Sequence, residues 1–165
     1  MRHAVIGVMG PGEGATGEDC NVAAALGELI AKEGWVLLTG GRSVGVMEAA
    51  ASAANEAGGL TIGVLPGSDH TRTSTSLRLA VLTGMGEARN NVNVLTSDIV
   101  IACGMNPGTA SEAALAIKAR RPLILLNQDS ITVSFFRRLN ENVRVAENVQ
   151  EAIGIARELL SAATR

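Results

Sequence analysis

The sequence predicts an α/β protein in which a mostly parallel sheet of six to seven strands is covered by helices on both faces. Short runs that are apolar throughout alternate with segments of helical periodicity. Hydrophobic residues make up 47% of the chain and aromatic residues only 2%. Such a core consists of small and aliphatic side chains, which let helices approach a sheet closely. Because no repeat or break in composition divides the chain, we expect residues 1–165 to form one domain.

The first third of the chain predicts two strand–loop–helix units. Residues 4–9 (AVIGVM) form the first strand and lead into the glycine-rich loop 10–17. Residues 19–33 carry apolar side chains at helical spacing and form the first helix. A second strand at 35–39 (WVLLT) precedes an alanine-rich helix at 46–57, which a Gly-Gly pair ends.

The middle of the chain predicts three more strands. Residues 60–65 (LTIGVL) and 77–83 (LRLAVLT) are apolar runs, and the polar, aperiodic segment 66–76 between them is a long loop. Residues 84–97 predict a loop that enters a short helix. The fifth strand is 98–103 (DIVIAC).

The last third continues the alternation. A helix over 108–120 follows the fifth strand, and 122–127 (PLILLN) is the sixth strand. A short helix at 131–139 and a short strand at 143–146 come next. Asn148 is the expected N-cap of the terminal helix.

Composition excludes several classes of function. A net charge of −2 and the scarcity of aromatic residues argue against nucleic-acid binding. Two cysteines and two histidines without metal-ligand spacing argue against a zinc site, and we predict no catalytic metal ion. No apolar run approaches the ~18 residues of a membrane span, and the opening residues do not resemble a signal peptide. We therefore expect a cytoplasmic protein, with Cys103 a buried thiol and no role for Cys20.

The predicted ligand site lies at one edge of the sheet. In open parallel sheets ligands bind beyond the carboxyl ends of the strands. Four loops meet there, at 10–17, 40–45, 84–91 and 104–112. The candidate ligand-binding residues in these loops are Gly10, Pro11, Gly12, Gly40, Gly41, Arg42, Ser43, Gly84, Met85, Arg89, Asn90, Asn106, Pro107, Gly108, Thr109 and Glu112.

The first two loops point to an anion. The 10–17 loop is glycine-rich but has neither dinucleotide-motif nor P-loop spacing, so a flexible surface loop is the alternative. In the second loop, Ser43 is a good N-cap, and backbone amides at a helix start attract anions. Arg42 beside them suits a phosphate contact. A tight turn with an exposed arginine is the alternative here.

Glu112 and Arg89 each have two interpretations. The spacing from Thr109 to Glu112 is that of a capping box, in which the carboxylate folds back onto the amide of Thr109. The other interpretation places Glu112 over a polar ligand. We expect mainly the capping role, with Asn106 hydrogen-bonding an oxo group of the ligand. Arg89 either faces the same crevice or lies exposed on a helix. No nucleophile motif or Cys–His pair is present.

Several of these segments together resemble one known family. GGRSVGVMEAAASAANEAGG, TIGVLPG, TGMGEARNN and the Gly-Thr-x-x-Glu element are similar to the family once labelled "possible lysine decarboxylase". That family includes the Lonely Guy phosphoribohydrolases and the molybdenum cofactor carriers. The resemblance implies a Rossmann-like three-layer sandwich that assembles as homodimers or homotetramers. In the hydrolase branch it implies cleavage of a nucleoside 5′-monophosphate with Arg89 and Glu112 at the reaction centre. The Pro-Gly-Gly of the hydrolases is Gly104, Met105 and Asn106 in this chain.

The carrier branch matches over longer stretches. The runs GVMGPGEGAT, EGWVLLTGGRSVGVM, TGMGEARNNVNVL and IACGMNPGTASEAALA are similar to molybdenum cofactor carriers. This resemblance implies a non-catalytic protein that binds, protects and delivers molybdenum cofactor, an anionic pterin, to molybdenum enzymes. An apolar floor around Met85 and Met105 is expected to shield the pterin. The alternatives are the phosphoribohydrolase and a domain that senses a nucleotide or another anion.

Overall fold

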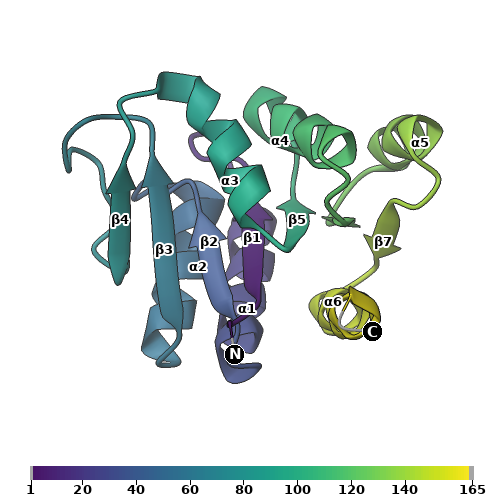
Figure 1. The fold of residues 1–165 in the computed structure, drawn as a ribbon, viewed down its shortest axis with the longest axis horizontal. Coiled ribbons are helices and arrows are strands. Elements are labelled where there is room, and N and C mark those ends of the chain that lie inside the picture. Colours follow the sequence, from purple (N-terminus) through teal and green to yellow (C-terminus); the bar gives the residue numbers. More distant parts are fainter. Residues whose placement is uncertain (1, 164–165) are drawn as a thin grey trace.

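Seven parallel strands form one sheet in the computed structural model, which describes residues 2–163 (Figure 1). Their order across the sheet is β4-β3-β2-β1-β5-β6-β7. The chain therefore builds outward from β1 in one direction as far as β4, and then returns to pair β5 with the other side of β1. Ligands of such sheets bind at this switch point, beyond the carboxyl ends of the two strands. The strands are β1 (Val5–Met9), β2 (Val36–Thr39), β3 (Leu60–Leu65), β4 (Leu79–Leu82), β5 (Ile99–Cys103), β6 (Leu123–Leu126) and β7 (Arg144–Ala146).

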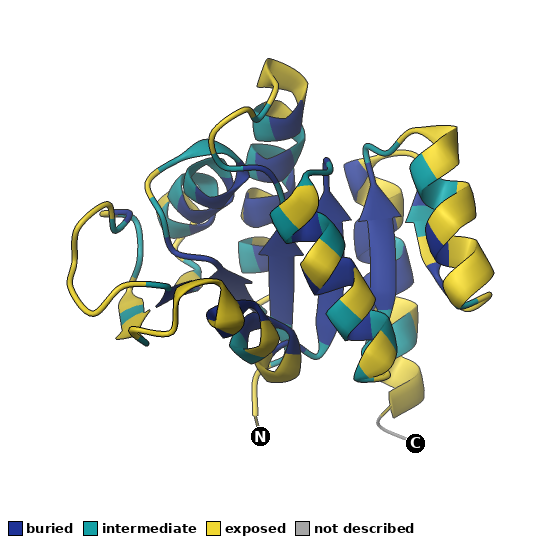
Figure 2. Ribbon diagram, turned by 90° about the horizontal axis from the view of Figure 1, so that it is seen from above, coloured by how far each residue is buried: buried dark blue, intermediate teal, exposed yellow. Residues whose placement is uncertain are grey.

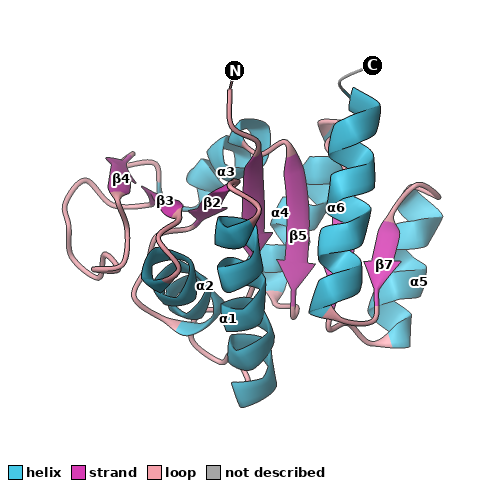
Figure 3. Cartoon of the chain, turned by 90° about the horizontal axis from the view of Figure 1, so that it is seen from below, coloured by secondary structure: helices cyan, strands magenta, loops and turns pink. Residues whose placement is uncertain are grey.

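Helices cover both faces of the sheet, which confirms the predicted three-layer fold. The helices α1, α2 and α6 share one apolar cluster with one face, and α3, α4 and α5 share a second cluster with the other (Figure 3). A short 3-10 helix, η1, leads directly into α3. The helices are α1 (Gly17–Lys32), α2 (Gly45–Glu56), η1 (Gly86–Arg89), α3 (Asn90–Thr96), α4 (Pro107–Lys118), α5 (Ser130–Leu139) and α6 (Val149–Ala163).

The central strands are buried on both faces, which explains why they are apolar throughout (Figure 2). All residues of β2, β5 and β6 are buried. Cys103 ends β5 as the expected buried thiol. Burial raises the pKa of this thiol to about 12, and the nearby Asp19 carboxylate adds to the shift. The thiol is therefore inert near neutral pH.

The residues at which the helices begin are determined by hydrogen bonds to their first amides, and the sequence predicts only some of these bonds. Asn148 caps α6 as predicted, since its Oδ1 accepts from the amide of Glu151 at 2.9 Å. The prediction of Ser43 as the N-cap of α2 is wrong, because the N-cap is Val44. The amide of Ser43 donates to the carbonyl of Arg72 at 2.8 Å. Pairing with the 66–76 loop thus keeps the chain extended past Ser43, and the helix begins at Gly45.

Residues 2–163 contain no helix that combines the length and the apolar character of a membrane span.

Candidate functional site

A small, partly open cleft lies at the carboxyl edge of the sheet, at the switch point between β1 and β5. All four of the predicted loops contribute to it, so the expected convergence is confirmed. The wall and floor combine bare backbone, charged side chains and two methionines. The residues that line the cleft are Val8, Met9, Gly10, Gly12, Gly40, Arg42, Met47, Glu87, Arg89, Asn90, Asn106, Gly108, Thr109 and Glu112.

Most of the predicted site residues reach this cleft, but some have other places. The carbonyl of Pro11 accepts from the amide of Val46 at 3.0 Å, and Ser43 pairs with the 66–76 loop. Met85 and Pro107 line a neighbouring groove. The remaining predicted residues outside the lining are Gly41 and Gly84.

Sequence reasoning missed four residues of the lining. Val8 and Met9 end β1, and Met47 belongs to the first turn of α2. All three are buried core residues that also border the cleft, and an apolar pattern in the sequence indicates only their burial. The predicted apolar floor around Met85 and Met105 is wrong, because neither lines the cleft. Met9 and Met47 line it instead, although both are buried and Met105 packs against the same core cluster as Met9. Glu87, the fourth, stands next to residues that were predicted.

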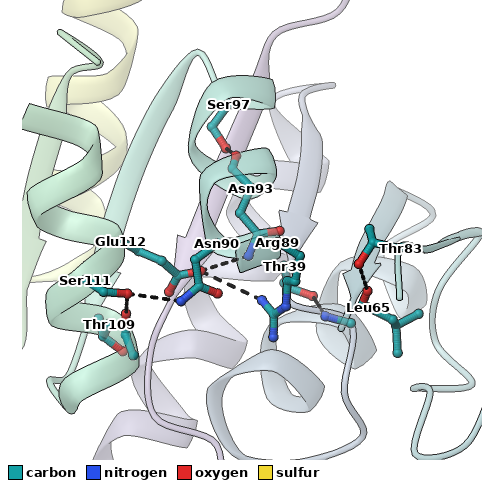
Figure 4. Close-up of polar contacts among 12 residues, drawn as sticks. Thr39, Leu65, Thr83, Arg89, Asn90, Asn93, Ser97, Thr109, Ser111 and Glu112 are labelled. Atoms are coloured by element: carbon teal, nitrogen blue, oxygen red, sulfur yellow. Dashed lines mark hydrogen bonds and ion pairs between the residues drawn. The ribbon is translucent and has the colours of Figure 1, made fainter. Parts of the chain in front are cut away.

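Arg89 and Glu112 form a buried ion pair at the centre of the cleft (Figure 4). Each residue is only 6% exposed, so the alternative of a solvent-exposed Arg89 is wrong. The Nη1 atom of Arg89 lies 3.9 Å from Oε1 of Glu112. Asn93 on α3 donates to the same carboxylate oxygen at 2.8 Å. Glu112 is thereby held toward Arg89 and the cleft.

The expectation that Glu112 caps its own helix is wrong. The N-cap of α4 is Asn106, whose Oδ1 accepts from the amide of Thr109 at 2.8 Å and from its hydroxyl at 2.9 Å. Pro107 is the first residue of the helix, so Thr109 is already its third. The capping distance of three residues thus runs from Asn106 to Thr109. Glu112 is left for the pair with Arg89.

Burial shifts the charge of this pair toward the positive. It raises the pKa of Glu112 to about 7, although the hydrogen bond from Asn93 and the charge of Arg89 oppose the shift. Burial also lowers the pKa of Arg89, and Glu112 counters that effect. An arginine keeps its proton even so. Near neutral pH the pair is a full cation beside a half-protonated carboxyl. Within residues 2–163 the Nε atom of Arg89 is buried without a hydrogen-bond partner.

The absence of a side chain at Gly40 leaves the space that the guanidinium of Arg89 occupies. A Cβ at Gly40 would lie 2.5 Å from Nη1 of Arg89 and 2.8 Å from the sulfur of Met47. Any larger residue would therefore displace the guanidinium. The Gly-Gly turn after β2 is thus part of the site through its lack of a side chain.

The start of α2 contributes less positive potential than the sequence predicts. The amide of Val46 is occupied by the carbonyl of Pro11. Arg42 lies at the rim, where its Nη2 pairs with Glu13 of the first loop at 3.0 Å. The buried guanidinium of Arg89 is consequently the main source of positive charge in the cleft.

Residues 2–163 hold no group of three or more His, Cys, Asp or Glu residues that is arranged to bind a metal ion. What the cleft offers is a buried cation, hydrogen-bond donors and two carboxyl groups, with little apolar surface.

Comparison with known proteins shows the family of this chain. Residues 3–153 match the model of the SLOG cluster4 family. The chain is a member of the SLOG cluster4 family. The match includes all four loops of the cleft.

Solved structures place this SLOG cluster4 protein beside proteins of known ligand. It is similar to the molybdenum cofactor binding protein of Rippkaea orientalis, with 51% identity, a TM-score of 0.96 and coverage of 97% of this chain and 99% of that one. It is also similar to the molybdenum cofactor carrier protein of Chlamydomonas reinhardtii, with 47% identity, a TM-score of 0.93 and coverage of 97% and 99%. An uncharacterized protein of Archaeoglobus fulgidus is 38% identical over 154 residues, which are 93% of this chain and 94% of that protein. The resemblance to the carrier branch is thereby confirmed.

Proposed function

We propose that this protein binds molybdenum cofactor, protects it and delivers it to apo-enzymes without catalysing a reaction. Two relatives are a molybdenum cofactor binding protein and a molybdenum cofactor carrier protein. Each is about half identical to this chain over nearly its whole length. The observation that carries the proposal is the buried Arg89, which is incompletely paired at the centre of the cleft. A buried cation of this kind favours an anionic ligand strongly, because little solvent screens it.

The residues of the cleft fit the chemistry of this cargo. The cofactor is anionic at its phosphate end and oxygen-rich at its molybdenum end, so it needs hydrogen-bond donors at both. The side chain of Asn106 uses Oδ1 for the helix cap, which leaves its Nδ2 to donate to a ligand. The amide of Gly108 lies in the first turn of α4, where helix amides attract anions.

A reconstitution assay tests the carrier function. Apo-protein is mixed with molybdenum cofactor, and samples taken over time are assayed for activation of a cofactor-free molybdenum enzyme. We expect the cofactor to remain active longer with the wild-type protein than with the Arg89→Met variant. A wild-type protein that protects no better than serum albumin would contradict the proposal.

The alternative phosphoribohydrolase activity is favoured by one observation, the meeting of Arg89 and Glu112 in the same cleft. In that reaction Glu112 would stabilise positive charge at the ribose, and Arg89 would hold the phosphate. The test is release of free base from AMP, with loss of release in Glu112→Gln. Absence of turnover in the wild-type protein eliminates this alternative.

We further propose that the protein acts in the cytoplasm as a homo-oligomer and that its recipients are molybdenum enzymes. Two exposed apolar patches support self-association. One lies on β3 and β4 and includes Leu79, which is 53% exposed. The other is on α5, where Ile131 is 80% exposed and Phe135 is 56% exposed. Soluble monomers rarely expose several such patches.

A further inference from the structure

The cleft continues sideways into a second hollow of a different character. This side groove lies between η1 and α4 and is lined mainly by apolar groups, among them Met85, Ala88, Pro107 and Leu115. Three residues line both hollows: Glu87, Asn90 and Gly108. The polar cleft and the apolar side groove are therefore two parts of one continuous surface. A ligand with an anionic end and a flat apolar ring matches such a division.

The border between the two parts is held by hydrogen bonds (Figure 4). Nδ2 of Asn90 donates to the hydroxyl of Ser111 at 3.0 Å, and that hydroxyl donates to the carbonyl of Gly108 at 2.7 Å. This chain ties the start of α3 to the start of α4. The width of the passage is thus fixed before a ligand arrives, which lowers the cost of binding.

Glu87 lies at this border, where its negative charge raises the pKa of the buried Arg89 and so helps to keep that cation charged. Its side chain is exposed, and within residues 2–163 its carboxylate makes no hydrogen bond or ion pair. It belongs to the same turn of η1 as Arg89. A free carboxylate this close to an anion site repels a simple anion. Beyond its effect on Arg89, its two accepting oxygens stand at the edge of the side groove, where they suit N–H donors on the part of a ligand beyond the anionic end.

We propose that Glu87 binds the 2-amino-4-oxo edge of a fused pyrimidine ring that occupies the side groove while the anionic end lies beside Arg89. The inference rests on the proposed function and gives the orientation of its cargo, since the pterin of molybdenum cofactor has this edge. An ionised carboxylate only accepts hydrogen bonds, and its two oxygens match the parallel N–H groups of the exocyclic amine and the adjacent ring nitrogen. The thioether of Met85 offers a polarisable contact to the ring.

The same geometry predicts a choice between purines. Guanine presents the same pair of N–H donors as a pterin, whereas adenine presents an acceptor where the ring N–H would be. Adenine would therefore leave one carboxylate oxygen without a partner, and site groups left unpaired cost affinity. Guanosine monophosphate is thus a stable substitute for the pterin, and adenosine monophosphate is its matched negative.

Equilibrium binding measurements test this assignment. Affinities are measured by calorimetry for neopterin 3′-phosphate, GMP, AMP and sulfate. We expect the wild-type protein to bind the first two at least about ten-fold more tightly than AMP. Glu87→Gln should lose about ten-fold in affinity for neopterin phosphate and GMP, because one accepting oxygen becomes a donor. The same variant should bind sulfate as tightly as the wild type or more tightly, because a repelling charge is gone.

Two further variants separate the outcomes. Glu141→Gln removes an exposed carboxylate far from the cleft in the sequence and should change no affinity. Met85→Ala should weaken binding of neopterin phosphate and GMP but not of sulfate. Equal affinity for GMP and AMP, or unchanged GMP affinity in Glu87→Gln, overturns the assignment. The carrier function is judged separately: if the wild type protects molybdenum cofactor while Glu87→Gln retains full GMP affinity, only the assignment of Glu87 fails. If the selectivity for GMP is found without protection, the ring site stands and the carrier function fails.

Discussion

At the scale of single residues, one buried cation determines what the cleft attracts. Arg89 is almost fully buried, and its nearest charged partner is a carboxyl whose pKa is raised to about 7 by burial. We predict that Arg89→Met lowers the affinity for sulfate by about ten-fold or more, because a charged hydrogen-bond donor is lost from a desolvated site. Isothermal calorimetry measures the effect. Lys118→Met, which removes an exposed cation at the other end of α4, should leave the affinity unchanged.

Glu112 predicts how anion binding depends on pH. With its pKa raised to about 7, its carboxyl is neutral below that pH and negative above it. The affinity for sulfate should therefore fall as the pH rises from 6 to 8. Sulfate itself remains a dianion over this range, so the slope reports the protein. In Glu112→Gln the side chain is neutral at every pH, and the slope should flatten at the tighter value. An unchanged slope in that variant would show that another group titrates.

The raised pKa of Glu112 also makes the stability of the fold depend on pH. The folded state binds the proton of Glu112 more tightly than the unfolded state, whose pKa is near the ordinary value of 4.5. The contribution of this group to the free energy of unfolding is therefore complete below about pH 4.5 and is lost as the pH rises through about 7.

The sequence placed the charged residues of the site correctly but not their partners. Arg89 and Glu112 follow strand ends, and a parallel sheet collects such positions at one edge. Glu112 accepts a hydrogen bond from Asn93, which lies on another helix. The spacing of residues around Glu112 gives no sign of this partner. Thr109 satisfies a capping-box pattern with Glu112, but Asn106 satisfies the same three-residue spacing with Thr109 and is the residue that caps. Spacing alone does not distinguish two overlapping patterns.

At the scale of elements, the cap of α4 joins helix stability to ligand binding. Asn106→Ala removes the acceptor of two hydrogen bonds and should lower the free energy of unfolding by about 1 kcal/mol. Asn106→Asp keeps the accepting oxygen and favours the helix dipole, so its stability should be retained. It should nevertheless weaken sulfate binding, because it replaces the donating Nδ2 by a negative charge. Urea unfolding and sulfate titration of both variants check the prediction.

A second cap provides the control for this prediction. Asn148→Ala removes the equivalent cap of α6, which does not contribute to the cleft. It should cost similar stability and leave sulfate affinity unchanged. Weaker sulfate binding in Asn148→Ala would mean that general loosening of the fold, and not the cap of α4, controls the site.

The positions of the strands could be predicted from the sequence more reliably than the residues at which the helices begin. The strands β2, β5 and β6 are buried on both faces, so a run of apolar residues suffices to locate them. The start of a helix depends on which group binds its first amides. For α1 that group is local, because Thr16 and Asp19 form a capping box. For α2 it is the carbonyl of Pro11, more than thirty positions earlier in the chain, and the sequence around Ser43 gives no sign of it.

At the scale of the whole molecule, the two apolar patches lie at opposite ends of the sheet (Figure 1). A two-fold symmetric contact uses the same patch on both copies, so two separate patches generate two different dimers. We propose that the two contacts form together with perpendicular two-fold axes, an arrangement that closes a tetramer. None of the residues that line the cleft belongs to either patch.

This arrangement predicts how the assembly comes apart. Leu79→Lys should break the contact at β4 and leave dimers joined through α5, while Phe135→Glu should leave dimers joined through β4. The double variant should be a monomer, because each substitution places a charge in only one of the two contacts. Light scattering coupled to size-exclusion chromatography gives the molar masses. A wild-type monomer would contradict the prediction, and so would a single substitution that dissociates a wild-type tetramer completely to monomers, because the two contacts would then not be independent.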